Sequence, residues 1–377
     1  MGRGSRPVSE VSGLTLLYPA NTLRPERFLC VYVKWREVMF ANLVSEYRYD
    51  ASETAQNATF DLMHCGYVCI VDENAKVLYH AGDVEDFVFY RSASKPIQSL
   101  PVFQYHLDEK YGITEKESAV FSASHIGAPY HVEAVESILA KMGYTEDILC
   151  MNPAAPGDPE VNEERIRRGI PKRKVFHNCS GKHCALLAVQ THLGGVPADY
   201  WKTGTPVFYE TQKAIRTVSE ADEVRIGVDG CGVPVFAVPV RNVAVSYKNL
   251  ACPDRIRDDA LAAAAAENTR RISQHPEMVR GKGYLTTVMN EDPNIIAKDG
   301  VNGIFAFGLK KQRMGAAIKF TDGTESGCTL LILEILRALD ALTPELEARL
   351  MALQPILYTN DNDRIVGERR CEIRIQV

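Results

Sequence analysis

Short apolar runs bounded by polar or glycine-rich turns alternate along the chain with longer amphipathic segments. The short runs are typical of buried strands, and the amphipathic segments are typical of helices. The pattern predicts strands at 66–71, 77–80, 86–90, 120–124, 224–228, 235–245, 304–309 and 316–321. It predicts helices at 97–105, 132–142, 182–192, 205–219, 258–273, 327–342 and 344–353.

Predicted strands lie near both ends of this order, and most of the helices lie between them. The pairs 66–71/77–80 and 304–309/316–321 are each joined by a short turn, which indicates antiparallel hairpins. We therefore expect one α+β domain, in which an antiparallel sheet with strands from both ends of the chain is flanked by helices. Residues 150–173, rich in proline, glycine and charge, are expected to form a connector.

Residues 1–38 follow neither of these patterns. They mix glycine, arginine and proline with scattered apolar residues, and they show no sustained strand or helix period. The domain-like pattern begins at Met39. We interpret 1–38 as an N-terminal extension, poorly ordered or the result of a misplaced start, and 39–377 as the folded domain.

The composition excludes several classes of protein. Of the 377 residues, 46% are hydrophobic and 24% are charged, which is ordinary for a globular protein. A net charge of −5 without a basic stripe argues against a nucleic-acid partner, and the apolar runs are too short or interrupted to span a membrane. The ten cysteines are dispersed and no signal peptide is visible, so we expect cytoplasmic thiols, some of them available as metal ligands.

The stretch 87–100, FVFYRSASKPIQSL, places Ser92 at a strand-to-helix junction and Lys95 one turn later on the same face. A serine hydroxyl needs a neighbouring base to act as a nucleophile, and a lysine can be that base when its pKa is lowered. The alternative interpretation is an N-cap serine followed by a solvated lysine, which is common for an isolated match. The pair is therefore a hypothesis that depends on the rest of the chain.

Two later segments carry further candidate groups. Ser124, at the end of predicted strand 120–124, could pass a proton between nucleophile and base, or could be an ordinary turn serine. The segment 177–184, HNCSGKHC, gathers thiol, imidazole, amide, hydroxyl and amine groups at a helix start. Cys179 and Cys184 are candidate zinc ligands, although the spacing is not that of a Cys-x-x-Cys finger. The phosphate-loop pattern is absent, so nucleotide binding is not expected.

Two glycine-containing turns complete the candidates. Asp229 precedes a Gly-Cys-Gly turn in which backbone can approach a ligand closely, so its carboxylate could hold the ammonium of an amino-acid substrate. The alternative is a tight hairpin turn. Lys298, followed by Asp299 and Gly300, precedes a predicted hairpin strand and could point into a cleft.

Five motifs occur in order, namely RSASKP (91–96), SHIGAPYH (124–131), HNCSGKH (177–183), DGCGVP (229–234) and KDGVNGIF through AAIKFTDG (298–323). With them, the chain from about Met39 to its C-terminus resembles the asparaginase II family of rhizobial type, the third structural class of L-asparaginases. The resemblance implies a fold similar to serine β-lactamases and penicillin-binding proteins, in which a Ser-x-x-Lys helix lies on an antiparallel sheet. It also implies hydrolysis of L-asparagine to L-aspartate and ammonia, and a homodimer.

The resemblance assigns roles to particular residues. Ser92 would be the nucleophile and Lys95 its neutral amine base, while Ser124 and Lys298 would form a second Ser–Lys pair. The implied substrate-binding residues are Arg91, His183 and Asp229, with Asp229 pairing with the α-ammonium.

The resemblance also implies a zinc ion near the site. The implied ligands are Cys179, Lys182 and Cys231. A lysine must lose its proton to coordinate a metal, so this is unusual ligand chemistry. We expect the metal to tune substrate binding and not to perform the hydrolysis.

The sequence departs from the family pattern at three places. Ala128 and Asn302 each stand where a glutamate is usual, and Met151-Asn152 replaces a Gly-x-His-like stretch. These changes leave the Ser–Lys residues in place but bear on substrate affinity. The alternatives are therefore a glutaminase, another Ser–Lys enzyme such as a β-lactam-recognising acyltransferase, or a non-catalytic zinc-dependent relative that only binds amino acids.

Overall fold

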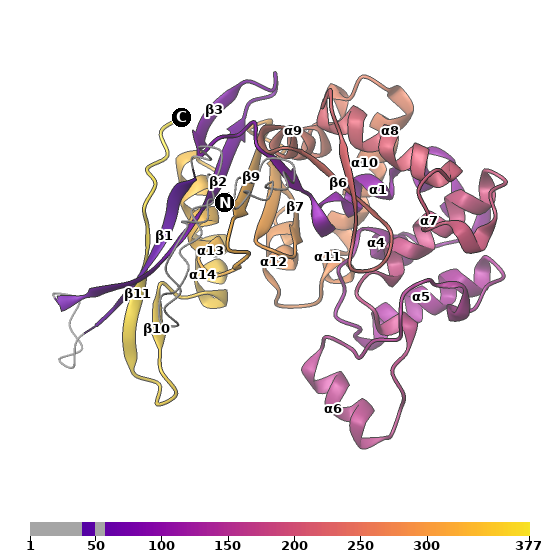
Figure 1. The fold of residues 1–377 in the computed structure, drawn as a ribbon, viewed down its shortest axis with the longest axis horizontal. Helices are drawn as coiled ribbons and strands as arrows, with labels where there is room; N and C mark the ends of the chain where they lie inside the picture. Colours follow the sequence, from indigo (N-terminus) through magenta and orange to yellow (C-terminus); the bar gives the residue numbers. More distant parts are fainter. Residues whose placement is uncertain (1–39, 50–56) are drawn as a thin grey trace, which may run out of the picture. The chain divides into compact units, whose positions relative to one another are not determined.

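The computed structural model describes residues 40–49 and 57–377. The predicted extension 1–38 lies outside these residues. Within the described part, an eight-stranded antiparallel sheet is flanked by helices, so the α+β class predicted from the sequence is confirmed (Figure 1).

The sheet joins strands from the two ends of the chain. Its strands, in spatial order, are β10 (Leu357–Thr359), β11 (Ile365–Cys371), β1 (Ala41–Arg48), β2 (Thr59–Val71), β9 (Met314–Phe320), β8 (Ile304–Leu309) and β7 (Ile295–Gly300), with β3 (Val77–Ala81) paired to β2. Both predicted hairpins, β2–β3 and β8–β9, are present. Strand β7, which carries Lys298, forms one edge of the sheet.

The main core lies between the sheet and two C-terminal helices, α13 (Cys328–Ala338) and α14 (Pro344–Leu353). On β8, Phe305, Phe307 and Leu309 point into this core, and the residues between them are buried as well. The core residues include Leu43, Val68, Ile70, Phe305, Phe307, Ile318, Phe320, Leu331, Ile335 and Leu350.

Helix α9 (Val240–Ala251) packs against β2, β8 and β9. Two sheet glycines permit this close approach. A Cβ at Gly308 would lie 2.0 Å from the carbonyl oxygen of Tyr247, and one at Gly315 would lie 2.1 Å from that of Ala244. Because no side chain fits at either position, the backbone of α9 lies directly on the sheet.

Helix α12 (Leu285–Glu291) packs against β7 and α14. The remaining helices lie to the right of the sheet in Figure 1. They are α1 (Lys95–Gln98), α2 (Leu100–Gln104), α3 (Leu107–Tyr111), α4 (Glu115–Ala119), α5 (Pro129–Lys141), α6 (Pro159–Arg167), α7 (Ser180–His192), α8 (Pro206–Ser219), α10 (Asp259–Gln274) and α11 (Pro276–Val279). A three-stranded sheet of order β4 (Phe87–Phe89), β6 (Pro234–Pro239) and β5 (Arg225–Val228) lies with them.

Three sequence predictions are wrong. Residues 120–124 form no strand but contain the 3₁₀ turn η3 (Val120–Ser122). Of the predicted strand 235–245, only β6 is a strand, and the rest belongs to α9. The first turns of α9, VRNVAV, continue the valine-rich run of β6, so the sequence does not mark where the strand ends and the helix begins. The predicted connector 150–173 contains α6, a helix without a buried residue and hence without apolar periodicity.

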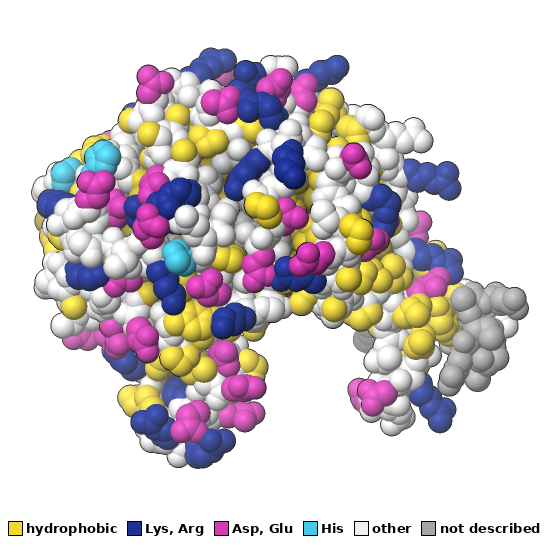
Figure 2. Space-filling model, turned by 180° about the vertical axis from the view of Figure 1, so that it is seen from behind, with side chains coloured by type: hydrophobic (Ala, Val, Ile, Leu, Met, Phe, Trp, Pro, Cys, Tyr) yellow, Lys and Arg dark blue, Asp and Glu magenta, His cyan; other side chains and the backbone are white. Residues whose placement is uncertain are grey.

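The described helices include none that is both long and apolar enough to cross a lipid bilayer. Figure 2 shows basic and acidic side chains interspersed over one face of the molecule. This mixing matches the many ion pairs at the surface, such as those of Arg270 with Glu115 and Glu267.

Candidate active site

Ser92 lies in a 3₁₀ turn, η2 (Arg91–Ser94), that follows β4 and leads into α1. Arg91 adopts a φ of +50°, in the left-handed region that residues other than glycine rarely occupy. Ser92 is 6% exposed, and its hydroxyl makes no hydrogen bond within the described residues. Backbone strain beside an unbonded, accessible hydroxyl is a combination that favours a functional role over a purely structural one.

Strand β7 lies against this turn because Gly300 has no side chain. A Cβ at Gly300 would lie 2.8 Å from the carbonyl oxygen of Tyr90 and 3.2 Å from the amide nitrogen of Ala93. The close approach places the lysine of the same strand, Lys298, beside the segment that carries Ser92.

A second glycine brings α7 to the same place. A Cβ at Gly181 would lie 2.1 Å from the carbonyl oxygen of Val120 in η3. The first turn of α7 therefore meets the segment 120–124, and its polar residues face the end of that segment. The backbone N–H of His125 donates to the carbonyl of Asn178 at 3.2 Å, which ties the two segments together.

Two buried lysine amines share the hydroxyl of Ser124. Lys95 Nζ lies 3.1 Å and Lys298 Nζ lies 3.0 Å from Ser124 Oγ, and both lysines are fully buried. Lys95 Nζ also donates to the carbonyl oxygens of Ala123 at 2.6 Å and Asn178 at 3.5 Å. Lys95 is thus hydrogen-bonded to Ser124 in this structure, and not to Ser92.

Burial shifts both amines toward the neutral form. It lowers the pKa of Lys95 from the ordinary lysine value. It also lowers the pKa of Lys298 to about 8, although the neighbouring carboxylate of Asp299 opposes that shift. The pKa of Asp299 lies below its usual range, because the charges of Lys298 and Arg280 outweigh the effect of its burial.

The first turn of α7 meets the turn after β5 through a thiol–amine cluster. Lys182 Nζ donates to Cys231 Sγ at 3.2 Å and lies 4.0 Å from Asp229 Oδ2. The interaction with Cys179 and the charge of Lys182 lower the pKa of the Cys231 thiol, and the pKa of Cys179 is raised in turn. Cys179 Sγ donates to Asn178 Oδ1 at 3.3 Å.

This cluster contains the three groups that the family resemblance implies as zinc ligands. Among residues 40–49 and 57–377, no three His, Cys, Asp or Glu side chains are grouped closely enough to hold a metal ion. The two thiols, Cys179 and Cys231, suit zinc, but a third protein ligand would have to be the Lys182 amine after loss of its proton. The donor set therefore fits zinc only with lysine as a ligand, and the metal stays a prediction.

Arg91 and Asp229 pair with each other. A guanidinium nitrogen of Arg91 lies 3.0 Å from Asp229 Oδ1, and the Asp229 side chain is 8% exposed. The Nε atom of Arg91 is buried without a hydrogen-bond partner in the described part of the chain. The two groups predicted to contact substrate thus lie together, next to Ser92, and Arg91 retains an unused donor.

His183, the third residue predicted to bind substrate, is fully buried. Its Nδ1 lies 2.7 Å from the hydroxyl of Tyr200 and 3.7 Å from Cys150 Sγ. Burial lowers the pKa of His183, so the ring is neutral at physiological pH. Tyr200 in turn accepts a hydrogen bond from the backbone N–H of Cys150 at 2.9 Å, which fixes the ring orientation.

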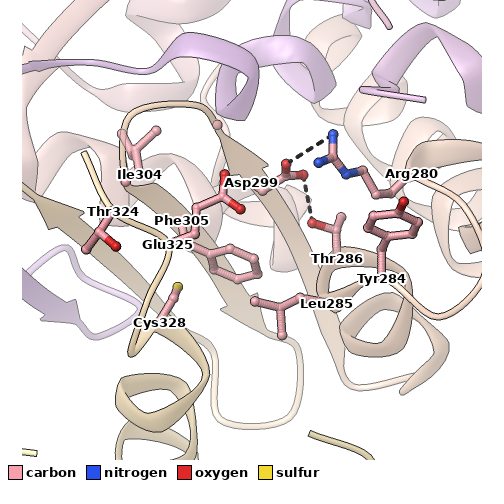
Figure 3. A pocket seen from close by; sticks show the side chains of 12 residues that line it. Arg280, Tyr284, Leu285, Thr286, Asp299, Ile304, Phe305, Thr324, Glu325 and Cys328 are labelled. Carbon is pink, nitrogen blue, oxygen red and sulfur yellow. Dashed lines mark hydrogen bonds and ion pairs between the residues drawn. The ribbon is translucent and has the colours of Figure 1, made fainter. Parts of the chain in front are cut away.

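A small cavity of about 60 Å³ adjoins β7 (Figure 3). Asp299 lines it, and Figure 3 shows its carboxylate between Thr286 and Arg280. Thr286 Oγ1 donates to Asp299 Oδ1 at 2.7 Å, and Arg280 lies 3.8 Å from Oδ2. The cavity does not include Ser92, so it is a neighbour of the candidate site and not the site itself.

Contacts and chain neighbours join all the predicted site residues into one cluster. These residues are Arg91, Ser92, Lys95, Ser124, Cys179, Lys182, His183, Asp229, Cys231 and Lys298. Sequence reasoning missed the contributions of Asp299, Asn178, Arg280 and Tyr200. The first two stand inside motifs that were recognised, whereas the last two carry no local signal.

Two of the departures from the family pattern lie in turns. Asn302 follows β7 with a φ of +65°, a conformation that asparagine tolerates better than most residues. Ala128 is the buried residue that precedes α5.

The fold and this cluster define an α+β protein whose buried serines and lysines meet at the edge of an antiparallel sheet. Its sequence matches the L-asparaginase II family over residues 53–371, and the chain therefore belongs to that family, which places it among the amidohydrolases. The resemblance stated from the motifs is confirmed.

Solved structures give more distant likenesses. The chain is similar to a β-lactamase from Mycobacterium bovis, with 16% identity over 76% of this chain and 94% of that chain and a TM-score of 0.37. It is also similar to a Bacillus glutaminase, with 10% identity over 73% of this chain and 91% of that chain and a TM-score of 0.35. No curated protein sequence matches the chain.

Proposed function

We propose that this protein hydrolyses the side-chain amide of L-asparagine to L-aspartate and ammonia, with Ser92 as the nucleophile. The observation that supports this most is the pair of buried amines, from Lys95 and Lys298, on the hydroxyl of Ser124 beside the Ser92 turn. Membership of the L-asparaginase II family supports amide hydrolysis as the reaction class.

Lys95 is the proposed base. Its hydrogen bonds run to two carbonyl oxygens and to Ser124, and the effect of burial on its pKa outweighs the opposing effect of the Cys179 and Cys231 thiols. Because burial also disfavours the ammonium form, a neutral amine is accessible to take the proton of Ser92. The proton passes to Lys95 directly, or by way of the Ser124 hydroxyl that already touches the amine.

The reaction then follows the acyl-transfer scheme. The Ser92 oxygen attacks the amide carbon, and backbone N–H groups at the start of the helix stabilise the tetrahedral oxyanion, a contribution of about 3–4 kcal/mol per donor. The proton taken from Ser92 is given to the leaving nitrogen, which departs as ammonia. Water then cleaves the β-aspartyl ester, returning a proton to Ser92 and releasing L-aspartate.

The pair of Arg91 and Asp229 provides the charges that an amino acid needs. An α-ammonium would pair with the Asp229 carboxylate, and an α-carboxylate would pair with the Arg91 guanidinium, whose Nε has no partner in the described residues. The zwitterionic substrate thus replaces one internal ion pair with two. This exchange leaves neither charge unpaired in a poorly solvated site.

Zinc is part of the proposal as a bound ion and not as the catalyst. Held by Cys179, Lys182 and Cys231, it would supply a fixed positive charge beside the substrate-binding carboxylate. The proposed ligand Lys182 lies 4.0 Å from Asp229 Oδ2.

The test is ammonia release from L-asparagine and L-glutamine by the full chain and by Ser92→Ala. We expect asparagine turnover that Ser92→Ala lowers by at least about 10³-fold, since loss of a nucleophile removes most of the catalysis. The unfolding free energy should change by less than about 1 kcal/mol, because the hydroxyl makes no hydrogen bond in the described structure. Ser94→Ala is the matched control, a buried serine of the same turn whose hydroxyl bonds only the carbonyl of Arg91.

The other outcomes separate the alternatives. Turnover of glutamine in preference to asparagine would identify a glutaminase. Binding of either amino acid in calorimetry without ammonia release would identify a non-catalytic relative. Unchanged turnover in Ser92→Ala would reject Ser92 as the nucleophile.

A further inference from the structure

The two lysines on Ser124 differ in their charged partners. Lys298 Nζ contacts a carboxylate, with Asp299 Oδ1 at 2.5 Å and the Asp299 carbonyl oxygen at 2.9 Å. The hydrogen bonds of Lys95 run to the Ser124 hydroxyl and to two carbonyl oxygens, and its acidic neighbours are the thiols of Cys179 and Cys231. Two ammonium groups on one hydroxyl would repel each other strongly in this buried place, and the carboxylate in contact with Lys298 favours the charged form of that amine.

The Asp299 carboxylate is held from two directions. Its Oδ1 accepts from both Lys298 Nζ and the hydroxyl of Thr286, and its Oδ2 faces Arg280 (Figure 3). Arg280 also donates to the backbone carbonyl of Ser124 at 3.0 Å. Hydrogen bonds and ion pairs therefore form a closed ring. It runs from the Ser124 hydroxyl through Lys298, Asp299 and Arg280 to the Ser124 carbonyl.

The contact between Lys298 and Asp299 lies on an edge strand, β7. Neighbouring residues of a strand point to opposite faces, so their side chains normally do not meet. Here the Lys298 amine contacts both Oδ1 and the backbone carbonyl oxygen of Asp299.

We propose that Asp299 is a positioning residue, which keeps Lys298 protonated and in place as a hydrogen-bond donor to Ser124 Oγ. With Lys298 donating to it, the Ser124 oxygen can pass its own proton to Lys95 or to the leaving nitrogen. This inference rests on the proposed function, and it assigns Asp299 a role that acts only through Lys298.

The ionisation of Lys298 then limits activity at high pH. The charged or titratable groups that face its amine are Asp299 on its own strand, Lys95 from α1 and Arg280 from the segment before α12. Asp299 raises the pKa of Lys298, whereas burial and the other two groups lower it. Removal of the carboxylate should therefore lower the pKa of Lys298, so that the protonated form, and with it activity, is lost at a lower pH.

The experiment compares the full chain with Asp299→Asn, which keeps size and shape but removes the charge. We expect kcat to fall at least tenfold at pH 7.5 with KM within about threefold, and the alkaline limb of the kcat profile to move down by about one pH unit or more. Asp299→Glu should restore part of kcat and shift the limb back. Asp108→Asn, which removes a carboxylate from a buried pair with Arg271 away from the site, should leave the profile unchanged.

A second readout does not need turnover. In protein labelled at the lysine Nζ, the signal assigned to Lys298 through Lys298→Arg should titrate at lower pH in Asp299→Asn than in the wild type. If the wild type releases no ammonia, the proposed function fails while this titration still decides the role of Asp299. An unchanged Lys298 titration, or an unchanged alkaline limb in an active enzyme, would overturn the proposal.

If Asp299→Asn does not fold, the variant Thr286→Val tests the same proposal. It removes one hydrogen bond to Asp299 Oδ1 and keeps all charges. We expect a smaller shift of the Lys298 titration in the same direction, and no shift at all would count against the proposal.

Discussion

Arg91 and Asp229 show how one pair of residues can serve two states of the enzyme. In the substrate-free structure each neutralises the other at 3.0 Å. When a zwitterion enters, each finds the opposite charge on the ligand, so the net number of paired charges rises. The Arg91 side chain in this pair extends from a backbone in the left-handed region, with a φ of +50°.

The role of Asp229 predicts a selective loss of affinity. Asp229→Asn should raise KM for L-asparagine at least tenfold with a smaller change in kcat, since the carboxylate binds the α-ammonium and not the reacting amide. Steady-state ammonia release measures both constants.

Succinamic acid, which lacks the α-ammonium, is the matched control substrate. The wild type should discriminate against it, and Asp229→Asn should lose most of that discrimination. Equal discrimination by the two proteins would place the ammonium elsewhere.

Sequence reasoning identified most of the candidate site, because the chemistry is concentrated in short motifs. Ser92 and Lys95 are separated by one turn, and Ser124 ends a recognisable segment. The hydrogen-bond partner of the proposed base was not predicted. Lys95 Nζ bonds Ser124 Oγ in the structure. The segment that carries Ser124 is packed against α7 at Gly181. No local pattern encodes a contact between residues 29 positions apart.

At the scale of elements, most helices and the hairpins were predictable, whereas the change from a strand to a helix that follows it directly was not. Strands β8 and β9 are apolar runs joined by a polar turn, so their pairing followed from the sequence. The strand prediction was wrong for α9 because the valine-rich run of β6 continues into the first turns of the helix, and β-branched residues favour strands. The polar side chains of α9, Asn242, Lys248 and Asn249, bond to the end of α8 and to Glu220.

Gly300 allows strand β7 to pack against the turn that carries Ser92. Gly300→Ala would bring a methyl group within 2.8 Å of the Tyr90 carbonyl oxygen and 2.6 Å of an Ile304 methyl carbon, so β7 has to move away from the Ser92 turn. We expect kcat to fall at least tenfold and the unfolding free energy to fall by about 1–3 kcal/mol, as is usual for overpacking. Urea unfolding and ammonia release measure the two effects.

Gly157→Ala serves as the comparison. A Cβ there would meet its nearest neighbours at 3.6 Å or more, which is ordinary contact, and its φ is not positive. The expected loss of stability is below about 1 kcal/mol, with activity retained. A Gly300→Ala enzyme as active as Gly157→Ala would show that the close approach of β7 is not needed.

At the scale of the whole molecule, the sheet depends on pairing between distant parts of the sequence. Strand β1 lies between β2 and β11, with Tyr47 paired to Phe60 on one side and to Glu368 on the other. The C-terminal strands β10 and β11 therefore reach the rest of the sheet only through β1. Such non-local pairing is costly in chain entropy and is stabilised here by the core shared with α13 and α14.

This dependence predicts where the chain can be shortened. The sheet, its core and the candidate site are all built from residues 40–49 and 57–377, and the family match begins at residue 53. A protein that starts at Met39 should therefore unfold within about 2 °C of the full chain and release ammonia at the same rate. A protein that starts at Asn57 lacks β1 and should lose the cooperative transition, because β2 and β11 are then left without their common neighbour. Thermal scans of the three proteins measure this, and a marked loss of stability in the Met39 version would show that residues 1–38 belong to the folded unit.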